Sequence, residues 1–449
     1  MSAVSPIRFP DLRSHQTMTM RAWWLVGLNI LIPGSAQILA GNRRLGRFGV
    51  ASTFVLWAIA VVSIVVYALA RTVIFTIITH PIGLTLIQVG LAAYAVLWAV
   101  LSLDTLRLAR LIKTGPAARP LIASLGVLVL IVTAGTASYG AYVSGVARGA
   151  ITSVFGGGNI AAPVNGRYNI LLLGGDAGAD RTGLRPDSIS VASVDANTGK
   201  TTMIGVPRNL EQSPFSKGSP LYQKFPDGYD CGDNCLISYL YTYGEEHPAL
   251  YPNALAAGSQ PGIEAMRDAV EGSLGIKLQY YVLIDMQGFA DLIDSLGGVT
   301  IDSHGRYPIG GQENSRGQPI NVNQWIEPGV QKMNGFTALW YSRSRHGTSD
   351  FDRMARQRQV QEAVLKQFSP ANVLTKFQAV AKAGTQVVKT DIPTGTLGSF
   401  VDLADKSRTL PVTTLELVPP LISSAHPDFA QIRQLVSSSF APSTATPTP

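Results

Sequence analysis

The sequence YNILLLGGD, residues 168–176, decides the fold of the largest folded part of this chain. Its largely apolar run, Tyr168–Leu173, has the length of a strand and is typical of one buried on both faces. Gly174 and Gly175 end the run and leave Asp176 at its carboxyl end. The sequence therefore predicts a central strand that delivers an acidic side chain to the edge of a sheet.

Strand and helix patterns alternate after this segment. Predicted strands cover residues 188–194, 201–206, 280–284 and 299–302, and predicted helices cover 288–296, 333–342 and 350–368. The first two of these strands flank a DANTG turn and are predicted to form a hairpin. We predict an α/β domain over residues 167–440, with a central mixed sheet in an α-β-α arrangement.

The first third of the chain is apolar enough to face lipid. Three segments, near 49–70, 82–103 and 121–146, each have about the ~20 residues needed to cross a bilayer. Basic residues cluster just before the third segment: Arg107, Arg110, Lys113 and Arg119. Cytoplasmic loops collect such residues, so we predict a multi-pass protein of the cell membrane whose α/β domain is extracytoplasmic.

A fourth apolar stretch, near residues 22–40, is interrupted by Pro33 and Gly34. This stretch is either a fourth span or a re-entrant hairpin that leaves the N-terminus inside, and the sequence leaves both alternatives open. Residues 1–20 form an N-terminal tail without the apolar core of a signal peptide. Residues 149–166 are Gly-rich and predict a flexible linker, whereas 441–449 predict a disordered Pro/Thr tail.

The net charge of +7 does not indicate nucleic-acid binding. Residues 1–150 hold twelve Lys or Arg and two acids, which leaves 24 basic and 27 acidic residues beyond them. The basic excess therefore reflects membrane topology. Cys231 and Cys235 are the only cysteines. A disulfide in an oxidising compartment is favoured over two free thiols, and a zinc site lacks further ligands nearby.

Two common kinds of site are not predicted. VDANTGKTTM, residues 194–203, contains a GKT, but Val194 stands where a phosphate-binding loop requires its first glycine. No G-x-S-x-G or H-E-x-x-H occurs, and the four histidines beyond residue 150 are scattered. Hydrolysis by a serine triad or by a zincin mechanism is therefore not expected.

Acidic and arginine side chains instead gather at predicted strand ends and helix starts. The set is Asp176, Arg185, Asp187, Arg208, Arg343, Arg345, Arg353 and Gln357. Carboxylates suit Mg²⁺, and guanidinium groups grip phosphate oxygens bidentately. Any one of them is better explained as half of a surface salt bridge, but their joint placement favours a pyrophosphate site.

Six motifs carry a family resemblance. In order they are NILLLGGDAG, RTGLRPDSISVASVD, IGVPRN, GFADLIDSLGGVTID, GVQKMNGFTALWYSRSRH and DFDRMARQRQV, between residues 169 and 360. Together they resemble the LytR-CpsA-Psr family of cell-wall glycopolymer transferases over roughly residues 167–368, more weakly to about 440. The resemblance implies transfer of a glycopolymer from a polyprenyl-pyrophosphate carrier in the lipid bilayer to peptidoglycan, through a phosphodiester link.

The resemblance also implies roles for the gathered residues. Asp176 and Asp187 would hold Mg²⁺, with Mn²⁺ as the alternative ion, and Arg208 would be the residue most important to rate. Arg185, Arg343, Arg345, Arg353 and Gln357 would grip the pyrophosphate. The cysteine-containing loop and the several spans look like actinobacterial members, whose polymer would be arabinogalactan or a similar polysaccharide.

The chain departs from the family pattern at two positions near these motifs. Asn209 follows Arg208 where the family usually has Asp, and Leu236 stands where many members carry Lys. Both changes favour a second interpretation, in which the domain binds a lipid-linked glycan without catalysis and acts as a scaffold or in signalling. A third interpretation is a pyrophosphatase that releases the lipid carrier to water.

Overall fold

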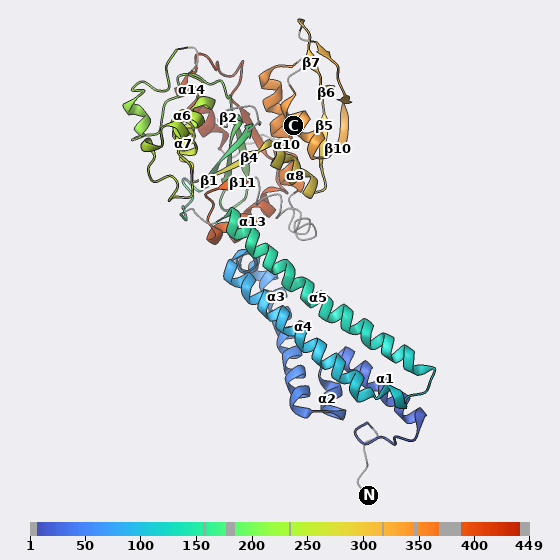
Figure 1. Cartoon of the computed structure of the whole chain (residues 1–449). Coiled ribbons are helices and arrows are strands. Elements are labelled where there is room, and N and C mark those ends of the chain that lie inside the picture. Colours follow the sequence, from blue (N-terminus) through green and yellow to red (C-terminus); the bar gives the residue numbers. More distant parts are fainter. Residues whose placement is uncertain are drawn as a thin grey trace, which may run out of the picture. The chain divides into compact units, whose positions relative to one another are not determined.

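The computed structural model describes residues 7–155, 159–176, 185–232, 235–316, 318–344, 348–367 and 388–440. The chain divides into two compact units, Met1–Arg148 and Gly149–Pro449. Each unit is described by itself. Figure 1 shows that the described part of the first unit is helical and that the second contains the sheets.

The first unit consists of helices. They are α1 (His15–Leu31), α2 (Ser35–Ala40), α3 (Arg43–Thr79), α4 (Pro81–Ala109), a short 3-10 turn (Leu111–Lys113) and α5 (Ala118–Val154). Among the described residues, Arg43–Thr79, Pro81–Lys113 and Ala118–Val154 are long and apolar enough to cross a membrane. These three helices contain the three predicted spans.

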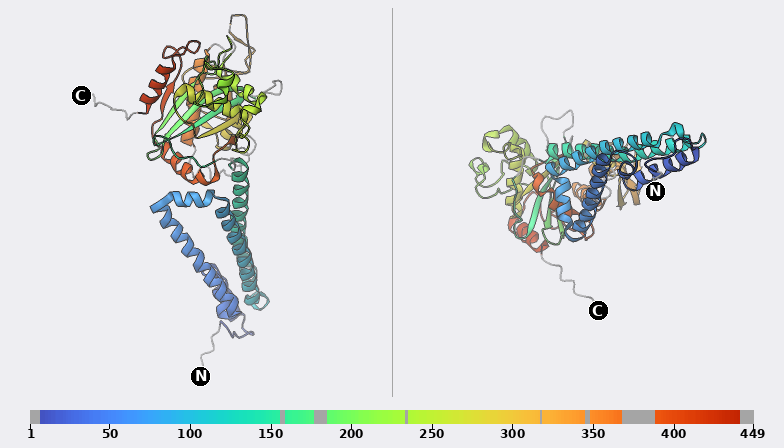
Figure 2. Two further views of the ribbon diagram at one scale, coloured as in Figure 1. Left: turned by 90° about the vertical axis from the view of Figure 1, so that its left-hand side faces the viewer. Right: turned by 90° about the horizontal axis from the view of Figure 1, so that it is seen from below.

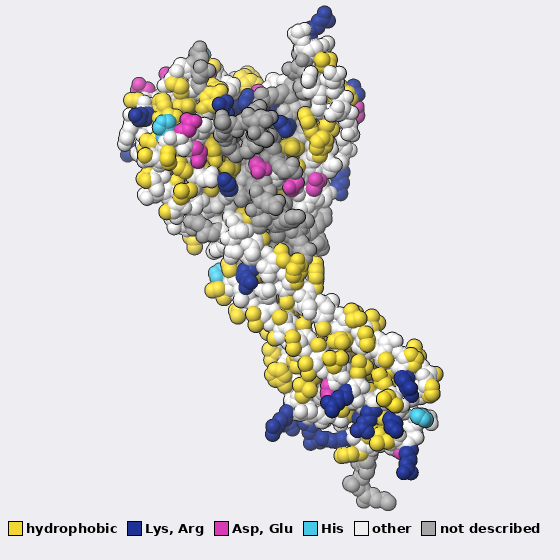
Figure 3. All heavy atoms as spheres, viewed as in Figure 1, with side chains coloured by type: hydrophobic (Ala, Val, Ile, Leu, Met, Phe, Trp, Pro, Cys, Tyr) yellow, Lys and Arg dark blue, Asp and Glu magenta, His cyan; other side chains and the backbone are white. Residues whose placement is uncertain are grey.

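Basic side chains in this unit gather mainly at one end (Figure 3). α3 begins with Arg43 and Arg44, and α4 ends next to Arg110. Apolar side chains cover most of the visible face between the two ends of the unit. This separation is typical of helices whose middle faces lipid and whose basic end faces the cytoplasm.

The stretch over residues 22–40 does not form one helix. α1 ends at Leu31, and α2 starts after a break at Pro33 and Gly34, where Gly34 has a φ of +95°. A Cβ at Gly34 would meet the backbone of α3, because the carbonyl oxygen of Gly46 would lie 2.5 Å away. No continuous helix therefore covers residues 22–40, and the predicted re-entrant hairpin is compatible with this break.

The predicted flexible linker differs from the structure at its start. Residues 149–154 continue α5, and residues 156–158 lie outside the described part. Ile151 and Phe155 pack in an apolar cluster with Tyr280, whose hydroxyl accepts a hydrogen bond from the Ala161 amide at 2.9 Å. The apolar side chains on both sides of the glycines thus pack inside the second unit, to which this segment belongs.

The second unit contains a six-stranded mixed sheet with the order β11-β4-β1-β2-β3-β12. Its strands are β1 (Arg167–Asp176), β2 (Arg185–Asp195), β3 (Thr201–Val206), β4 (Tyr280–Asp285), β11 (Val388–Thr390) and β12 (Thr413–Glu416). β1 is parallel to β4 and antiparallel to β2, and the predicted β2–β3 hairpin is present. The predicted α/β class with a mixed sheet is confirmed.

Helices cover both faces of this sheet (Figure 1). One face packs against α6 (Leu240–Glu246), α7 (Pro261–Leu274) and α14 (Phe429–Ser439), and the other faces α8 (Met286–Ser295) and α10 (Asp350–Gln367). Figure 2 shows α13 (Leu397–Ser407) across one end of the sheet. Leu171 and Leu173 of β1 belong to the main core, whereas Ile170 and Leu172 point to the opposite face.

A smaller apolar cluster supports the second layer. β5 (Val299–Ser303) was predicted as a strand and is one, but it pairs with β10 (Gly329–Met333) in a separate two-stranded sheet. The other short strands are β6 (Tyr307–Ile309), β7 (Gln312–Glu313), β8 (Pro319–Ile320) and β9 (Gln324–Ile326). Ala338 and Tyr341 of α9 (Gly335–Arg343) are buried in this cluster with Val360 of α10. This apolar cluster therefore holds α9 and α10 in position relative to each other.

Two further predictions concern the loops and the C-terminal part. Cys231 and Cys235 form a disulfide with Cα atoms 5.4 Å apart, so the predicted pairing is confirmed. Leu417 and Ile432 lie in the main core, which means that the described part of residues 371–440 completes the predicted domain. The predicted tail at 441–449 lies outside the described residues.

Candidate functional site

An irregularity in the pairing of β1 with β2 turns the Asp187 side chain toward the cavity that contains the candidate site. Gly174 pairs with Ser188 and Gly175 pairs with Pro186, so Asp187 is an extra residue without a partner in this ladder. Such a bulge breaks the alternation of side chains and re-aims one of them. Asp187 and its neighbour Ser188 consequently both line one cavity.

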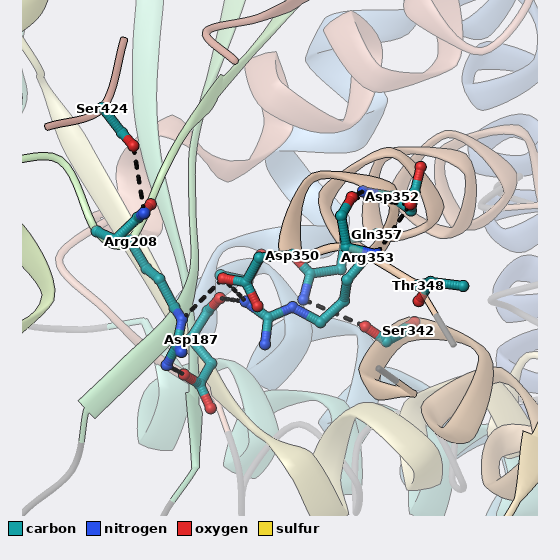
Figure 4. A network of polar contacts seen from close by, with 12 residues as sticks. Asp187, Arg208, Ser342, Thr348, Asp350, Asp352, Arg353, Gln357 and Ser424 are labelled. Carbon is teal, nitrogen blue, oxygen red and sulfur yellow. Dashed lines mark hydrogen bonds and ion pairs between the residues drawn. The ribbon is translucent and has the colours of Figure 1, made fainter. Parts of the chain in front are cut away.

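Arg208 belongs to the polar cluster in Figure 4 and lies two residues after the end of β3. Its Nη1 donates to Asp187 Oδ1 at 2.6 Å, and its Nε donates to Asp350 Oδ2 at 3.1 Å. Burial lowers the pKa of Arg208, but the carboxylates of Asp187 and Asp350 more than offset this effect and raise the pKa above its ordinary value. Arg208 therefore stays charged while it bridges two elements.

α10 contributes a second arginine and an amide. Arg353 is 2% exposed, and its Nη2 donates to Asp350 Oδ2 at 3.1 Å and to the Asp187 carbonyl at 3.4 Å. Gln357 lies one turn further along and donates to the Ser342 carbonyl at 3.3 Å. Because Asp350 accepts from both arginines, it joins the end of β3 to the start of α10.

Two more arginines stand at the rim, each beside an aromatic ring. The guanidinium of Arg185 lies 4.7 Å from the ring centre of Tyr239. The guanidinium of Arg343 lies 5.7 Å from the ring centre of Trp340. Stacking on an aromatic face holds a guanidinium group in place while its N–H donors remain directed outward.

These polar groups surround the mouth of a cavity of about 930 Å³. Behind them the cavity runs between the sheet and helices α8, α10 and α13. Its apolar lining includes Ile170, Leu172, Ala192, Val194, Met203, Val282, Ile284, Phe289, Leu339, Val364, Leu365, Ile392, Phe400, Leu403 and Val412. A charged mouth that leads into an apolar interior is suited to an amphiphile with an anionic head and a hydrocarbon tail.

Most of the sequence-predicted site residues meet here. Arg185, Asp187, Arg208, Arg343, Arg353 and Gln357 all line the cavity. Asp176 ends β1 opposite Arg185, but its side chain and the whole of Arg345 lie outside the described part. Sequence reasoning missed Tyr239 and Asp350, although the acid three residues before Arg353 at a helix start was a usable signal.

The acids of this site suit a divalent metal ion that is held by one or two carboxylates together with the phosphates of a substrate. The described residues contain no group of three or more His, Cys, Asp or Glu side chains that could hold a metal ion. Mg²⁺, however, is commonly held by one or two carboxylates together with substrate phosphates and water. The neighbouring strand ends at Asp176 and Asp187 could provide that many carboxylates.

The two departures from the family pattern lie beside the cluster. The Asn209 side chain donates to Ser424 Oγ at 3.2 Å, so this bond directs it to another loop. Leu236 precedes the short 3-10 turn Ile237–Tyr239 and is not part of the cavity lining. Neither residue interrupts the bridge from Asp187 through Arg208 to Asp350.

A largely buried ion pair links α10 to β12. Arg358 Nε is 3.3 Å from Glu416 Oε1 on β12, and their side chains are 5% and 19% exposed. Among the described residues, neither carboxylate oxygen of Glu416 accepts a hydrogen bond. Burial raises the pKa of Glu416 to about 7, an effect that the charge of Arg358 only partly offsets.

The Glu416→Gln variant is expected to change how stability depends on pH. The pKa of Glu416 in the folded protein, about 7, exceeds the ordinary value of 4.5. The folded state therefore holds this proton more tightly, and its stabilising effect is lost as pH rises from about 4.5 through 7, by at most about 1.4 kcal/mol per pH unit. Glutamine does not titrate, so the wild type should lose stability relative to the variant over this range.

Melting temperatures of the two full-length proteins in detergent, measured in parallel from pH 5 to 8, check this expectation. Glu327→Gln is a matched control, because Glu327 forms an exposed ion pair with Arg306. Parallel pH profiles for wild type and Glu416→Gln would contradict a raised pKa at Glu416.

Comparison with known proteins identifies the family. The model of the LytR_cpsA_psr family matches residues 158–419, which is more than half of the chain. Biofilm regulatory protein A of Streptococcus mutans is 31% identical over 231 residues, covering 50% of this chain and 50% of that protein. A polyisoprenyl-teichoic acid–peptidoglycan teichoic acid transferase TagU, from Halalkalibacterium halodurans, is 29% identical over 227 residues, covering 50% and 61%.

The chain thus spans about half to three fifths of the length of these curated relatives. A crystal structure of Bacillus subtilis TagV aligns with 61% of this chain and 95% of that chain, at 21% identity and a TM-score of 0.44. The matched region contains the central strands and every residue of the arginine cluster described above. The chain belongs to the LytR_cpsA_psr family.

Proposed function

We propose that this protein transfers a glycopolymer from a polyprenyl-pyrophosphate carrier to peptidoglycan and forms a phosphodiester link. The observation that carries the proposal is the arginine-rich mouth of the apolar cavity. A pyrophosphate would lie among Arg185, Arg208, Arg343 and Arg353, and part of the prenyl chain would enter the cavity. The names of the relatives support this activity, because several are teichoic acid transferases that act on peptidoglycan.

In the proposed reaction a hydroxyl of the acceptor attacks the phosphorus nearer the sugar, and polyprenyl phosphate leaves. Phosphoryl transfer depends mainly on positioning and on stabilisation of the charge that develops on the oxygens. Arg208 is suited to this role, because two carboxylates hold its guanidinium at fixed positions. Mg²⁺ bound at Asp176 and Asp187 would supply additional positive charge beside the phosphates, and Mn²⁺ is an alternative.

The helices of the first unit support a location in the cell membrane. We propose that α3, α4 and α5 cross the cell membrane with their basic end in the cytoplasm, so that the α/β domain is extracytoplasmic. A lipid-linked donor is confined to the bilayer, and peptidoglycan lies outside it. Arabinogalactan, which the sequence resemblance implies, and teichoic acid, which the relatives' names give, are both glycopolymers, so the proposal is made for that class.

Removal of the divalent ion is expected to abolish transfer. The full-length protein in detergent would receive a polyprenyl-pyrophosphate-linked oligosaccharide, a peptidoglycan fragment and Mg²⁺, and mass spectrometry would detect a phosphodiester-linked product. Chelation should remove the product, and excess Mg²⁺ should restore it. Free sugar phosphate without coupling would instead establish a hydrolase, and binding without turnover would establish the non-catalytic alternative.

A further inference from the structure

The outer face of α9 carries a line of side chains that the proposed reaction does not use. Phe336, Trp340 and Arg343 follow at spacings of four and three residues, which places them on one face of the helix. The rings of Phe336 and Trp340 meet edge to face, with centres 6.3 Å apart. Arg343 lies over Trp340 and also lines the cavity mouth, so the line ends at the proposed pyrophosphate site.

Phe336 is the exposed end of this line. It is 54% exposed, whereas Trp340 packs partly against the cluster that contains Ala338 and Tyr341. A single exposed phenylalanine is ordinary on a protein surface. Here, however, the exposed ring contacts the half-buried Trp340, over which lies Arg343 of the cavity mouth.

We propose that Phe336 and Trp340 form a subsite for a pyranose ring beside the transferred phosphate. The helix rise places Phe336 roughly 10 Å from Arg343, which is within reach of the first sugars attached to a pyrophosphate held by Arg343. Pyranose rings present apolar C–H faces that stack on aromatic rings, while their hydroxyl groups remain in water. The proposal rests on the proposed function for its location beside a sugar pyrophosphate.

Two sugars could occupy this subsite, one of the donor and one of the acceptor strand. The probes are geranylgeranyl pyrophosphate without sugar, geranylgeranyl pyrophosphoryl-N-acetylglucosamine, and the N-acetylglucosamine tetramer as an acceptor-type glycan. Calorimetry would measure their binding to the full-length protein in a detergent without sugar head groups. Because binding is measured without turnover, failure of transfer and failure of the subsite remain distinguishable.

The Phe336→Ala variant should weaken binding of one sugar-bearing probe about threefold to tenfold and leave the sugar-free pyrophosphate unaffected. Loss for the sugar pyrophosphate assigns the subsite to the donor, and loss for the tetramer assigns it to the acceptor. Phe336→Tyr keeps the ring and should retain binding. Leu255→Ala is the matched control, because Leu255 is also exposed, at 75%, and lies in a different loop.

Two results would overturn the proposal. One is unchanged binding of both sugar-bearing probes to Phe336→Ala, which would leave the exposed ring to a protein or lipid contact. The other is an equal loss for the sugar-free pyrophosphate, which would mean that Phe336 only supports the position of Arg343.

Discussion

Glycopolymer transfer by the Arg208→Ala variant is expected to fall about a thousandfold or more, with the fold intact. Arg208 donates to carboxylates on both β2 and α10, through Asp187 and Asp350. Its removal takes away the charge that would neutralise the reacting phosphate. It also removes one of the cations that offset the negative charges of Asp187 and Asp350 beside that phosphate. Single-turnover assays with the lipid-linked donor would measure the loss.

Arg208→Lys separates charge from geometry. Lysine keeps one positive charge but lacks the planar fork that reaches both carboxylates, so we expect activity to remain far below that of the wild type. The Arg208 ion pairs are about one third exposed and contribute only about 1 kcal/mol to stability. Circular dichroism should therefore show a folded variant. Lys224→Ala, at an exposed position, is the control, and activity of Arg208→Ala near that of Lys224→Ala would exclude a role in rate.

The central strands could be predicted because their burial leaves a simple signal. β1 is apolar on both faces, since Leu171 contributes to the main core and Leu172 lines the cavity. The same double burial hides the cavity, because a residue facing a lipid-sized space and one facing a packed core look alike in sequence. The residues that line the apolar cavity therefore could not be identified from the sequence.

The residues of the site could be predicted more easily than the contacts between them. Motifs gave Asp187, Arg208 and Arg353 as separate charges, but the bridge through Asp350 depends on how α10 packs near the end of β3. The bulge at Asp187 depends on a register shift between two strands. Similarly, β5 reads as a strand from its own residues, yet its partner β10 follows only from tertiary structure. Non-local pairing of this kind leaves little trace in a single sequence.

Filling the cavity is expected to make the protein selective for donors with short chains. Ala192 on β2 lines the apolar interior, on the face opposite to Val191, which is buried in the main core. An indole at this position would project into a cavity of about 930 Å³, so it can be accommodated without crowding the core. It would occupy space that the prenyl chain needs. We expect Ala192→Trp to lower kcat/KM for a long polyprenyl donor by about a hundredfold.

Short-chain donors decide whether this loss comes from the cavity. A donor with one or two prenyl units needs only the charged mouth, so Ala192→Trp should use it nearly as well as the wild type. Ala192→Val adds little volume and should retain most activity with both donors, whereas Leu255→Trp controls for an added indole at an exposed position. Equal loss with long and short donors would mean that the indole disturbs Asp187 on the same strand. An unchanged kcat/KM for the long polyprenyl donor would mean that the prenyl chain binds elsewhere.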